Sequence, residues 1–127
     1  MNENEVKLLE EESKIAWENG EIEKTYEINR KLSDEFPQSY MFKVRCMNNL
    51  IQLKRFNEAK DIYLKCLNEM KDRGCGWKLF ESQEKSEYLL PMRLKESFFR
   101  SCLANGYYNE LKEEAYEIID FYCKARL

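Results

Sequence analysis

The sequence predicts an all-α protein built as a stack of three antiparallel helical hairpins. Apolar side chains recur every three or four residues along most of the 127-residue chain, which is the periodicity of amphipathic helices. No segment keeps the alternation of apolar and polar residues that is typical of a half-buried strand. Similar short stretches begin at Gly20, Lys54 and Gly106, and a unit that returns at such spacings is typical of a stacked-helix array.

The first hairpin is predicted over about residues 3–36. An apolar stripe at helical spacing indicates a helix over residues 3–19, and Gly20 can end it because glycine readily adopts the left-handed conformation found after a helix. A second helix is predicted over residues 21–35. It ends before Pro37, because the residue ahead of a proline avoids helical dihedral angles.

The second hairpin is predicted over about residues 38–72. Its first helix, residues 38–54, has Ser39 as a candidate N-cap and is apolar on two sides, which predicts a position between neighbouring helices. Its second helix, residues 57–72, has Asn57 as a candidate N-cap.

An insertion over residues 73–91 is predicted to separate this hairpin from the third, which covers about residues 92–126. Two glycines flank Cys75, so the start of the insertion should not be helical. A short helix is expected before Pro91, which suits the first turn of the following helix. The helices of the third hairpin, separated by Gly106, are predicted over residues 92–105 and 108–126.

The composition is that of a folded, water-soluble domain. Hydrophobic residues make up 43% and charged residues 35% of the chain, which differs from the disordered class, and the apolar runs are too short for a membrane span. The first residues are polar and acidic, unlike a secretory signal, and the five cysteines lack the spacing of a disulfide framework. We therefore expect one domain over residues 1–127, located in the reducing cytoplasm.

The cysteines are expected to be structural. Cys46, Cys66, Cys102 and Cys123 lie on apolar helix stripes, which predicts that they are small core residues. Cys75, between its two glycines, is the single candidate for an exposed and reactive thiol.

No pattern in the chain indicates catalysis. The chain has no histidine, which excludes Ser–His and Cys–His nucleophile pairs and histidine metal sites. It has no Gly-rich phosphate loop and no Cys-x-x-Cys metal motif. Its clustered glutamates, such as Glu10–Glu12 and Glu113–Glu114, are interpreted as solvated outer faces of the terminal helices. We therefore expect no catalytic residues, no bound metal and no cofactor.

The turn and helix residues together resemble the tetratricopeptide repeat. The first unit has Gly20 at the turn between its helices and Tyr26 after it, with Pro37 closing the unit. The second unit has Phe56-Asn57-Glu58-Ala59 where the family often has Tyr-Glu-Glu-Ala. The third begins with Gly106. The resemblance implies a right-handed α-solenoid, in which stacked hairpins share one core.

The chain also departs from the family pattern at several positions. Thr25 and Leu111 stand where a small residue is usual, and Asn29 stands where an aromatic residue is usual. Lys54 replaces the turn glycine of the second unit.

The resemblance further implies a binding surface and a partner. In similar arrays the first helix of each pair lines a concave face, and its polar and aromatic candidates here are Lys7, Lys14, Trp17, Arg45, Asn48, Gln52, Arg93 and Arg100. Ile51 and Leu103 are expected among them as apolar neighbours. This mixture suits an extended or helical peptide with acidic groups. The implied function is a protein- or peptide-binding scaffold, acting as an adaptor, chaperone-like or regulatory module.

The charge distribution leaves other partners open. Residues 1–36 carry 5 basic and 11 acidic side chains, whereas residues 37–80 carry 9 basic and 4 acidic ones. The acidic part allows a small inhibitor or immunity-type protein that caps a basic partner. Nucleic acid is disfavoured, because the chain is acidic overall and the basic residues lie on different helix faces. Self-association through an apolar patch is a further alternative.

Overall fold

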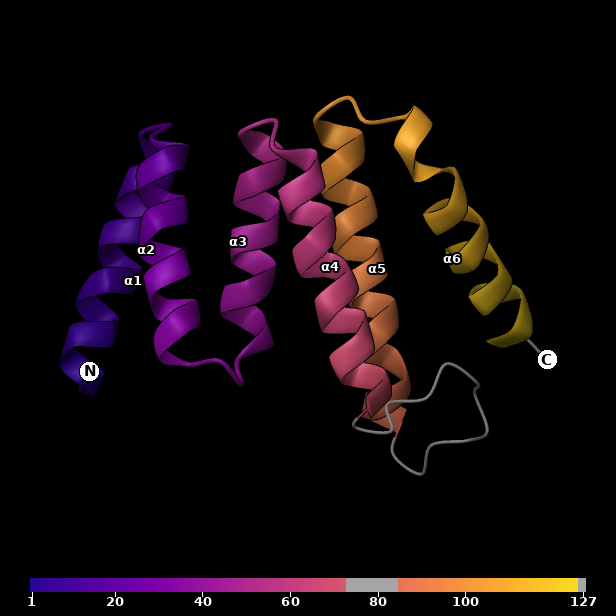
Figure 1. Ribbon diagram of the computed structural model, residues 1–127, viewed down its shortest axis with the longest axis horizontal. Coiled ribbons are helices and arrows are strands. Elements are labelled where there is room, and N and C mark those ends of the chain that lie inside the picture. The colour runs from indigo at the N-terminus through magenta and orange to yellow at the C-terminus, as the bar shows by residue number, and fades with distance from the viewer. Residues whose placement is uncertain (73–84, 126–127) are drawn as a thin grey trace. The chain divides into compact units, whose positions relative to one another are not determined.

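A computed structural model of the chain describes residues 1–72 and 85–125, and these ranges consist of helices joined by short turns (Figure 1). Its helices are α1 (Glu3–Glu18), α2 (Ile22–Glu35), α3 (Tyr40–Gln52), α4 (Phe56–Asp72), α5 (Lys85–Ala104) and α6 (Lys112–Ala125), with a 3₁₀ turn η1 (Asn109–Leu111) before α6. The described ranges contain no strand, so the predicted all-α class is confirmed. The solenoid arrangement stays a prediction.

The predicted helix boundaries are close to the observed ones for α1 to α4, with one cap misplaced. Ser39 is the N-cap of α3, although its side chain makes no capping hydrogen bond. Asn57 does not cap α4, which begins one residue earlier at Phe56. The reason is local, because the Ala59 N–H donates to the Arg55 carbonyl oxygen (3.1 Å), and this bond brings Phe56 into the first helical turn.

The predicted break at Pro91 is wrong. α5 begins at Lys85 and includes Pro91 in its interior, so residues 85–91 belong to the helix and not to an insertion. A proline in a helix removes one backbone hydrogen bond but still has a helical φ angle, and the buried ring of Pro91 packs in the interior. The rest of the predicted insertion, residues 73–84 with Cys75, lies outside the described residues.

The chain divides into two compact units, Met1–Ile62 and Tyr63–Leu127, and the division falls inside α4. We call them the first unit and the second unit. The predicted single domain stays a prediction.

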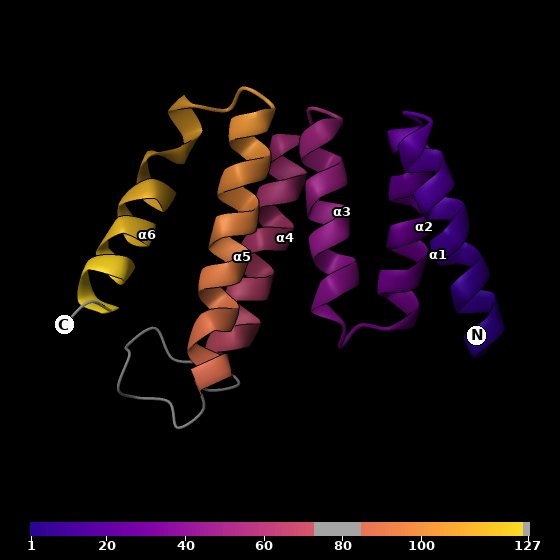
Figure 2. The same ribbon diagram turned by 180° about the vertical axis from the view of Figure 1, so that it is seen from behind.

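In the first unit α2 packs against both α1 and α3, and consecutive helices run in opposite directions (Figure 2). The buried apolar residues of this unit are Ala16, Tyr26, Ile28, Leu32, Phe42, Cys46, Met47, Leu50, Ile51 and Ala59. Val6, Leu9 and Phe36 pack against this core and are partly buried. Ile51 was expected on the concave face, but it is fully buried and belongs to the core instead.

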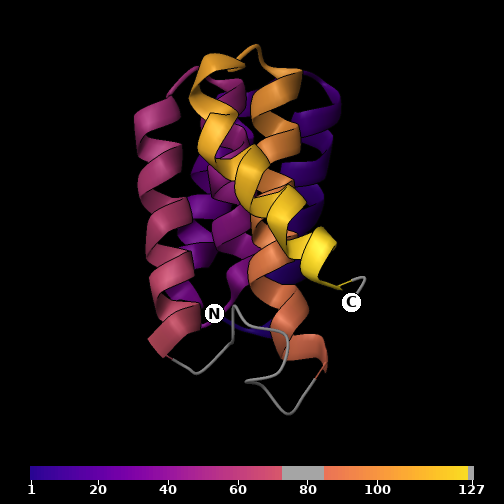
Figure 3. The ribbon, with the colours of Figure 1, turned by 90° about the vertical axis from the view of Figure 1, so that its right-hand side faces the viewer.

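In the second unit α6 runs obliquely across α5 and packs against it (Figure 3). Tyr63 on α4 stacks on Phe98 of α5, with ring centroids 4.2 Å apart and ring planes 6° from parallel. Burial raises the pKa of Tyr63 above its usual range, and the negative charge of Glu114 raises it further. The tyrosine hydroxyl is therefore neutral at physiological pH.

Two charged residues of the second unit are buried, and one of them, Glu114, contradicts a prediction. Glu114 was expected on a solvated outer face, but only 5% of it is exposed, because it follows the buried Leu111 by one helical turn and shares its face. Lys95 of α5 is buried to the same degree and forms an ion pair with Glu117 of α6. This pair links the two helices.

Three of the four helix cysteines are buried as predicted, and one is not. Cys46, Cys66 and Cys102 are buried free thiols, whereas Cys123 is exposed. Burial raises the pKa of the Cys46 thiol to about 12, so this thiol is protonated at neutral pH and a poor nucleophile. The prediction for Cys123 was wrong because α6 has two apolar stripes, and this residue lies on the outer one.

The three turns that follow α1, α3 and α5 share one hydrogen-bond pattern. After α1, the Gly20 N–H donates to the Trp17 carbonyl oxygen (3.1 Å), and the Glu21 N–H donates to that of Ala16 (2.8 Å). After α3, the Lys54 N–H donates to the Ile51 carbonyl oxygen (3.0 Å) and the Arg55 N–H to that of Leu50 (2.8 Å). After α5, the Gly106 N–H donates to the Leu103 carbonyl oxygen (3.3 Å) and the Tyr107 N–H to that of Cys102 (3.0 Å). This pattern is the Schellman motif, so the recurring sequence stretches adopt recurring turns.

Lys54 takes the left-handed conformation that glycine takes in the other two turns. Its φ angle is 64°, compared with 77° at Gly20 and 86° at Gly106. Replacing Lys54 with glycine is expected to raise the free energy of unfolding by about 0.5–1 kcal/mol. Glycine removes the steric cost of the left-handed conformation, and this gain is partly offset because glycine increases the conformational entropy of the unfolded chain. Urea denaturation followed by circular dichroism measures this change.

The Lys54→Ala variant is the control for this prediction, because it removes the lysine side chain but keeps the Cβ atom that is strained at positive φ. Alanine should therefore give no gain. An equal gain from both variants would show that the strain at this turn is not the cause.

Candidate functional site

The predicted site residues of α1 lie on one stripe of that helix. Lys7, Lys14 and Trp17 are spaced i, i+7 and i+10, with Glu10 between them, and this spacing places all four on one side of a helix. Lys7 and Lys14 are exposed, and 54% of Trp17 is exposed. A large aromatic side chain with this exposure is available for contact with a partner.

The predicted site residues of α3 form a matching stripe. Arg45, Asn48 and Gln52 follow Met41 at helical spacing. Met41 and Arg45 are exposed, and Asn48 and Gln52 are half-buried. The stripe therefore becomes more buried towards the end of α3.

An ion pair joins the two stripes. Arg45 Nη1 lies 3.3 Å from Glu10 Oε1, so the exposed sides of α1 and α3 meet at this point. We call the surface formed by Lys7, Glu10, Lys14, Trp17, Met41, Arg45, Asn48 and Gln52 the α1–α3 face. An exposed ion pair contributes only about 0–1 kcal/mol to stability, so its main effect is to orient Arg45. The Arg45 guanidinium also lies 5.8 Å from the centroid of the Phe42 ring.

A chain of side-chain amides connects this face to the core of the first unit. Asn29 Nδ2 donates to Asn49 Oδ1 (2.9 Å), and Asn49 Nδ2 donates to Gln52 Oε1 (3.3 Å). Asn29 and Asn49 are both buried. The side-chain carbonyl oxygen of Gln52 is thus held by the buried Asn49, and the side-chain N–H₂ group of Gln52 can donate a hydrogen bond to a partner.

The sequence interpretation missed this amide chain, although one signal was present. Asn29 replaces the aromatic residue that is usual in the resembled family, and a polar residue at an apolar position requires a partner. Asn49 lies on the adjacent helix, 20 residues away in the sequence, and supplies that partner.

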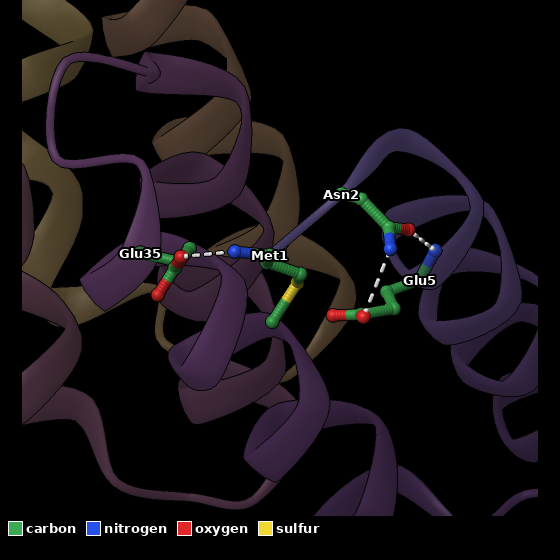
Figure 4. Close-up of polar contacts among 4 residues, drawn as sticks. All are labelled: Met1, Asn2, Glu5 and Glu35. Carbon is green, nitrogen blue, oxygen red and sulfur yellow. Dashed lines mark hydrogen bonds and ion pairs between the residues drawn. The ribbon is translucent and has the colours of Figure 1, made fainter.

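The start of α1, which carries the first half of the face, is fixed by its own polar contacts (Figure 4). Asn2 Oδ1 accepts from the Glu5 N–H (2.9 Å), and Asn2 Nδ2 donates to Glu5 Oε1 (3.0 Å), so Asn2 caps the helix. The Met1 ammonium group donates to Glu35 Oε1 (3.0 Å), which ties the start of α1 to the end of α2. The sequence interpretation did not predict this cap.

The remaining predicted site residues belong to the second unit. Arg93 and Arg100 are exposed on α5, seven residues apart on one side of that helix. Leu103, the expected apolar neighbour, is exposed one turn after Arg100. The joint use of all eight predicted residues stays a prediction.

Several acidic and basic groups of the first unit are paired within the unit. Besides the Arg45–Glu10 pair, Lys24 Nζ lies 3.7 Å from Glu12 Oε1, and Arg55 forms a two-point ion pair with Glu58. Arg55 also lies over the Tyr26 ring, 5.2 Å from its centroid. These contacts reduce the charge that either the acidic or the basic surface offers to a partner.

Other kinds of site were sought in the same residues. Within the ranges 1–72 and 85–125, no group of three or more cysteine, aspartate and glutamate side chains is arranged to hold a metal ion. None of the helices in these ranges is both long enough and apolar enough to span a bilayer.

Comparisons of the chain with protein-family models, with curated proteins and with solved structures found no match. The function is therefore inferred from the sequence pattern and the geometry of the chain itself.

Proposed function

We propose that this chain is a tetratricopeptide-like helical-repeat scaffold that binds another protein or a peptide through the α1–α3 face. The observation that carries the proposal is the Arg45–Glu10 ion pair, which joins the two stripes of predicted site residues, one of which includes the exposed Trp17. Four free thiols in the described chain, at Cys46, Cys66, Cys102 and Cys123, suit a location in the reducing cytoplasm.

The turns support the repeat assignment within this proposal. All three follow the Schellman pattern at the predicted spacings, including the turn in which Lys54 replaces glycine. Thr25, which replaces a small residue of the resembled family, is buried between α1 and α2, and its hydroxyl lies 3.2 Å from the Ser13 carbonyl oxygen. A hydrogen bond between helices at this position is compatible with close packing of the hairpin.

The chemistry of the face suits one class of partner. Trp17 and Met41 offer apolar contact area, and aromatic side chains dominate the binding energy of many interfaces. Lys7 and Lys14 favour carboxylate groups on the partner, and Arg45 has further N–H donors besides the Nη1 group that contacts Glu10. The amides of Asn48 and Gln52 can hydrogen-bond to a peptide backbone. An extended or helical peptide with acidic and apolar residues satisfies all three requirements.

Charge reversal at Arg45 and loss of the aromatic ring at Trp17 test this proposal. A library of acidic peptides is screened for binding to the Trp77→Phe variant, in which Trp17 is the remaining tryptophan and reports on binding by fluorescence. The Arg45→Glu and Trp17→Ala variants are each expected to weaken binding by at least about 30-fold, which corresponds to the loss of a central contact. Trp17→Ala is measured by calorimetry, because it removes the fluorophore.

The matched control is Lys31→Glu, a charge reversal at an exposed residue of α2 that lies outside the α1–α3 face. It should change peptide binding by less than threefold, about the effect of a peripheral charge. Equal loss in Lys31→Glu and Arg45→Glu would show attraction by net charge alone. Binding that survives Arg45→Glu but is lost on reversing Glu21, Glu23 and Glu27 would favour the acidic inhibitor instead.

A further inference from the structure

Glu10 lies among the basic groups of the α1–α3 face. Lys7 precedes it by three residues and Lys14 follows it by four, so both lysines are its neighbours on the same side of α1. Arg45 approaches from α3, with its Nη1 atom 3.3 Å from Glu10 Oε1. Three basic side chains are therefore arranged around one carboxylate, and this carboxylate belongs to the chain itself.

The contact between Arg45 and Glu10 is loose. Its length of 3.3 Å exceeds the roughly 2.7–2.9 Å of a strong hydrogen bond between charged groups. Water reaches both partners, because 44% of the Arg45 side chain and 35% of the Glu10 side chain are exposed. By contrast, Arg55 holds Glu58 through two nitrogen atoms, Nε and Nη2. Another carboxylate can therefore replace Glu10 at Arg45 at a small cost.

Opening of this ion pair leaves the core of the first unit in place. Both α1 and α3 are held by their packing on α2, and the apolar cluster beneath them includes Leu32 and Phe42. The guanidinium group of Arg45 also lies 5.8 Å from the centroid of the Phe42 ring, a contact that does not involve Glu10. Arg45 therefore keeps one of its two supports when the glutamate moves away.

We propose that Glu10 occupies the place of an acidic side chain of the bound peptide, and that a carboxylate of the peptide displaces Glu10 from Arg45. This inference rests on the proposed function and identifies the residue that sets the specificity of the α1–α3 face. A peptide carboxylate replaces one ion pair with another, whereas a neutral or basic side chain would leave Arg45 without this partner. In the free protein, the negative charge of Glu10 lowers the affinity for acidic peptides.

Replacing Glu10 with glutamine tests the displacement. The probe is the acidic peptide that binds the wild-type chain most tightly in the library screen, labelled with fluorescein and followed by fluorescence anisotropy. Glu10→Gln should lower its dissociation constant by about three- to tenfold, which corresponds to the loss of one exposed competing ion pair. Circular dichroism checks that the helical fold is retained, as expected when an exposed ion pair is removed.

The matched control is Glu12→Gln. Glu12 lies on the same helix and is also paired with a basic side chain, since its Oε1 atom is 3.7 Å from Lys24 Nζ. It is turned about 200° around the helix from Glu10, so it lies outside the α1–α3 face. Both substitutions remove one negative charge, yet Glu12→Gln should change the dissociation constant by less than about twofold. Equal tightening by both variants would show a general charge effect and would overturn the displacement.

Substitutions in the peptide identify the carboxylate that takes the place of Glu10. Each acidic residue of the peptide is replaced by glutamine in turn, and binding to the wild-type and Glu10→Gln chains is compared. At one position the loss of affinity should be about three- to tenfold larger in Glu10→Gln, because the peptide carboxylate there no longer competes with Glu10. Equal losses in both chains at every position would contradict the inference.

The Arg45→Glu variant separates failure of this inference from failure of the proposed function. If Arg45→Glu weakens peptide binding but Glu10→Gln does not tighten it, the peptide uses the α1–α3 face and Glu10 only orients Arg45. That result would overturn the displacement and leave the proposed function standing. If neither variant changes the dissociation constant, the peptide does not bind at this face, and both proposals are wrong.

Discussion

Replacing Leu32 with alanine is expected to lower the free energy of unfolding by about 2–5 kcal/mol. Leu32 lies on α2, is 0% exposed, and belongs to a cluster with Ile28 and Phe42. Val6 and Leu9 of α1 pack against this cluster, so the leucine contributes to the contacts of α2 with both neighbouring helices. The substitution removes these contacts and leaves a cavity that the surrounding helices can fill only in part.

Urea denaturation followed by circular dichroism at 222 nm measures the loss. The control is Leu8→Ala, the same substitution at an exposed position of α1, which should change stability by no more than about 0.5 kcal/mol. If Leu32→Ala and Leu8→Ala lowered the free energy of unfolding equally, the loss would reflect helix propensity and not the burial of Leu32. The interior position of α2 between α1 and α3 would then be wrong.

Replacing either Asn29 or Asn49 with leucine is expected to lower the free energy of unfolding by about 1–3 kcal/mol, because the amide of the other residue is left buried without its hydrogen bond. The two side chains are buried and joined by a bond of 2.9 Å. Replacing both with leucine should cost less than the sum of the single losses, because no unpaired amide of the pair then remains.

A double-mutant cycle in urea measures this coupling, which should amount to about 0.5–3 kcal/mol. Asn68→Leu, the same change at an exposed position of α4, supplies the control and should have little effect on stability. Additive losses from Asn29→Leu and Asn49→Leu would show that the two amides do not interact in solution. The chain of amides would then not extend from Asn49 to Asn29.

Much of the helical architecture follows from local sequence rules. Gly20 and Gly106 mark turns because glycine tolerates positive φ, and the 34-residue spacing from Gly20 identifies Lys54 as the equivalent turn residue despite its side chain. All three residues have positive φ angles, so local conformational rules and periodicity were sufficient at these positions.

The errors concern properties that depend on tertiary packing. Glu114 is buried and Cys123 is exposed because α6 turns one of its two apolar stripes towards α5, and periodicity alone does not say which. Pro91 lies inside α5 because flanking residues with good helix propensity outweigh the loss of one hydrogen bond.

The candidate site was predicted only in part for the same reason. Trp17 and Arg45 were expected at the site because, in the resembled family, the first helix of each pair lines the concave face. Their meeting across α1 and α3 depends on the Glu10 partner of Arg45, which lies 35 residues away and is brought close by the packing of both helices on α2. Such pairings are set by the crossing of helices, which the spacing within one helix does not contain.

The position of the division between the two units has a consequence for α4. This helix runs without interruption from Phe56 to Asp72, yet the division lies between Ile62 and Tyr63. Its first turns are therefore protected by one hydrophobic core and its last turns by another. A local opening of either core frees the amide protons at one end of α4 for hydrogen exchange, while those at the other end keep the slow rates of an intact cooperative unit.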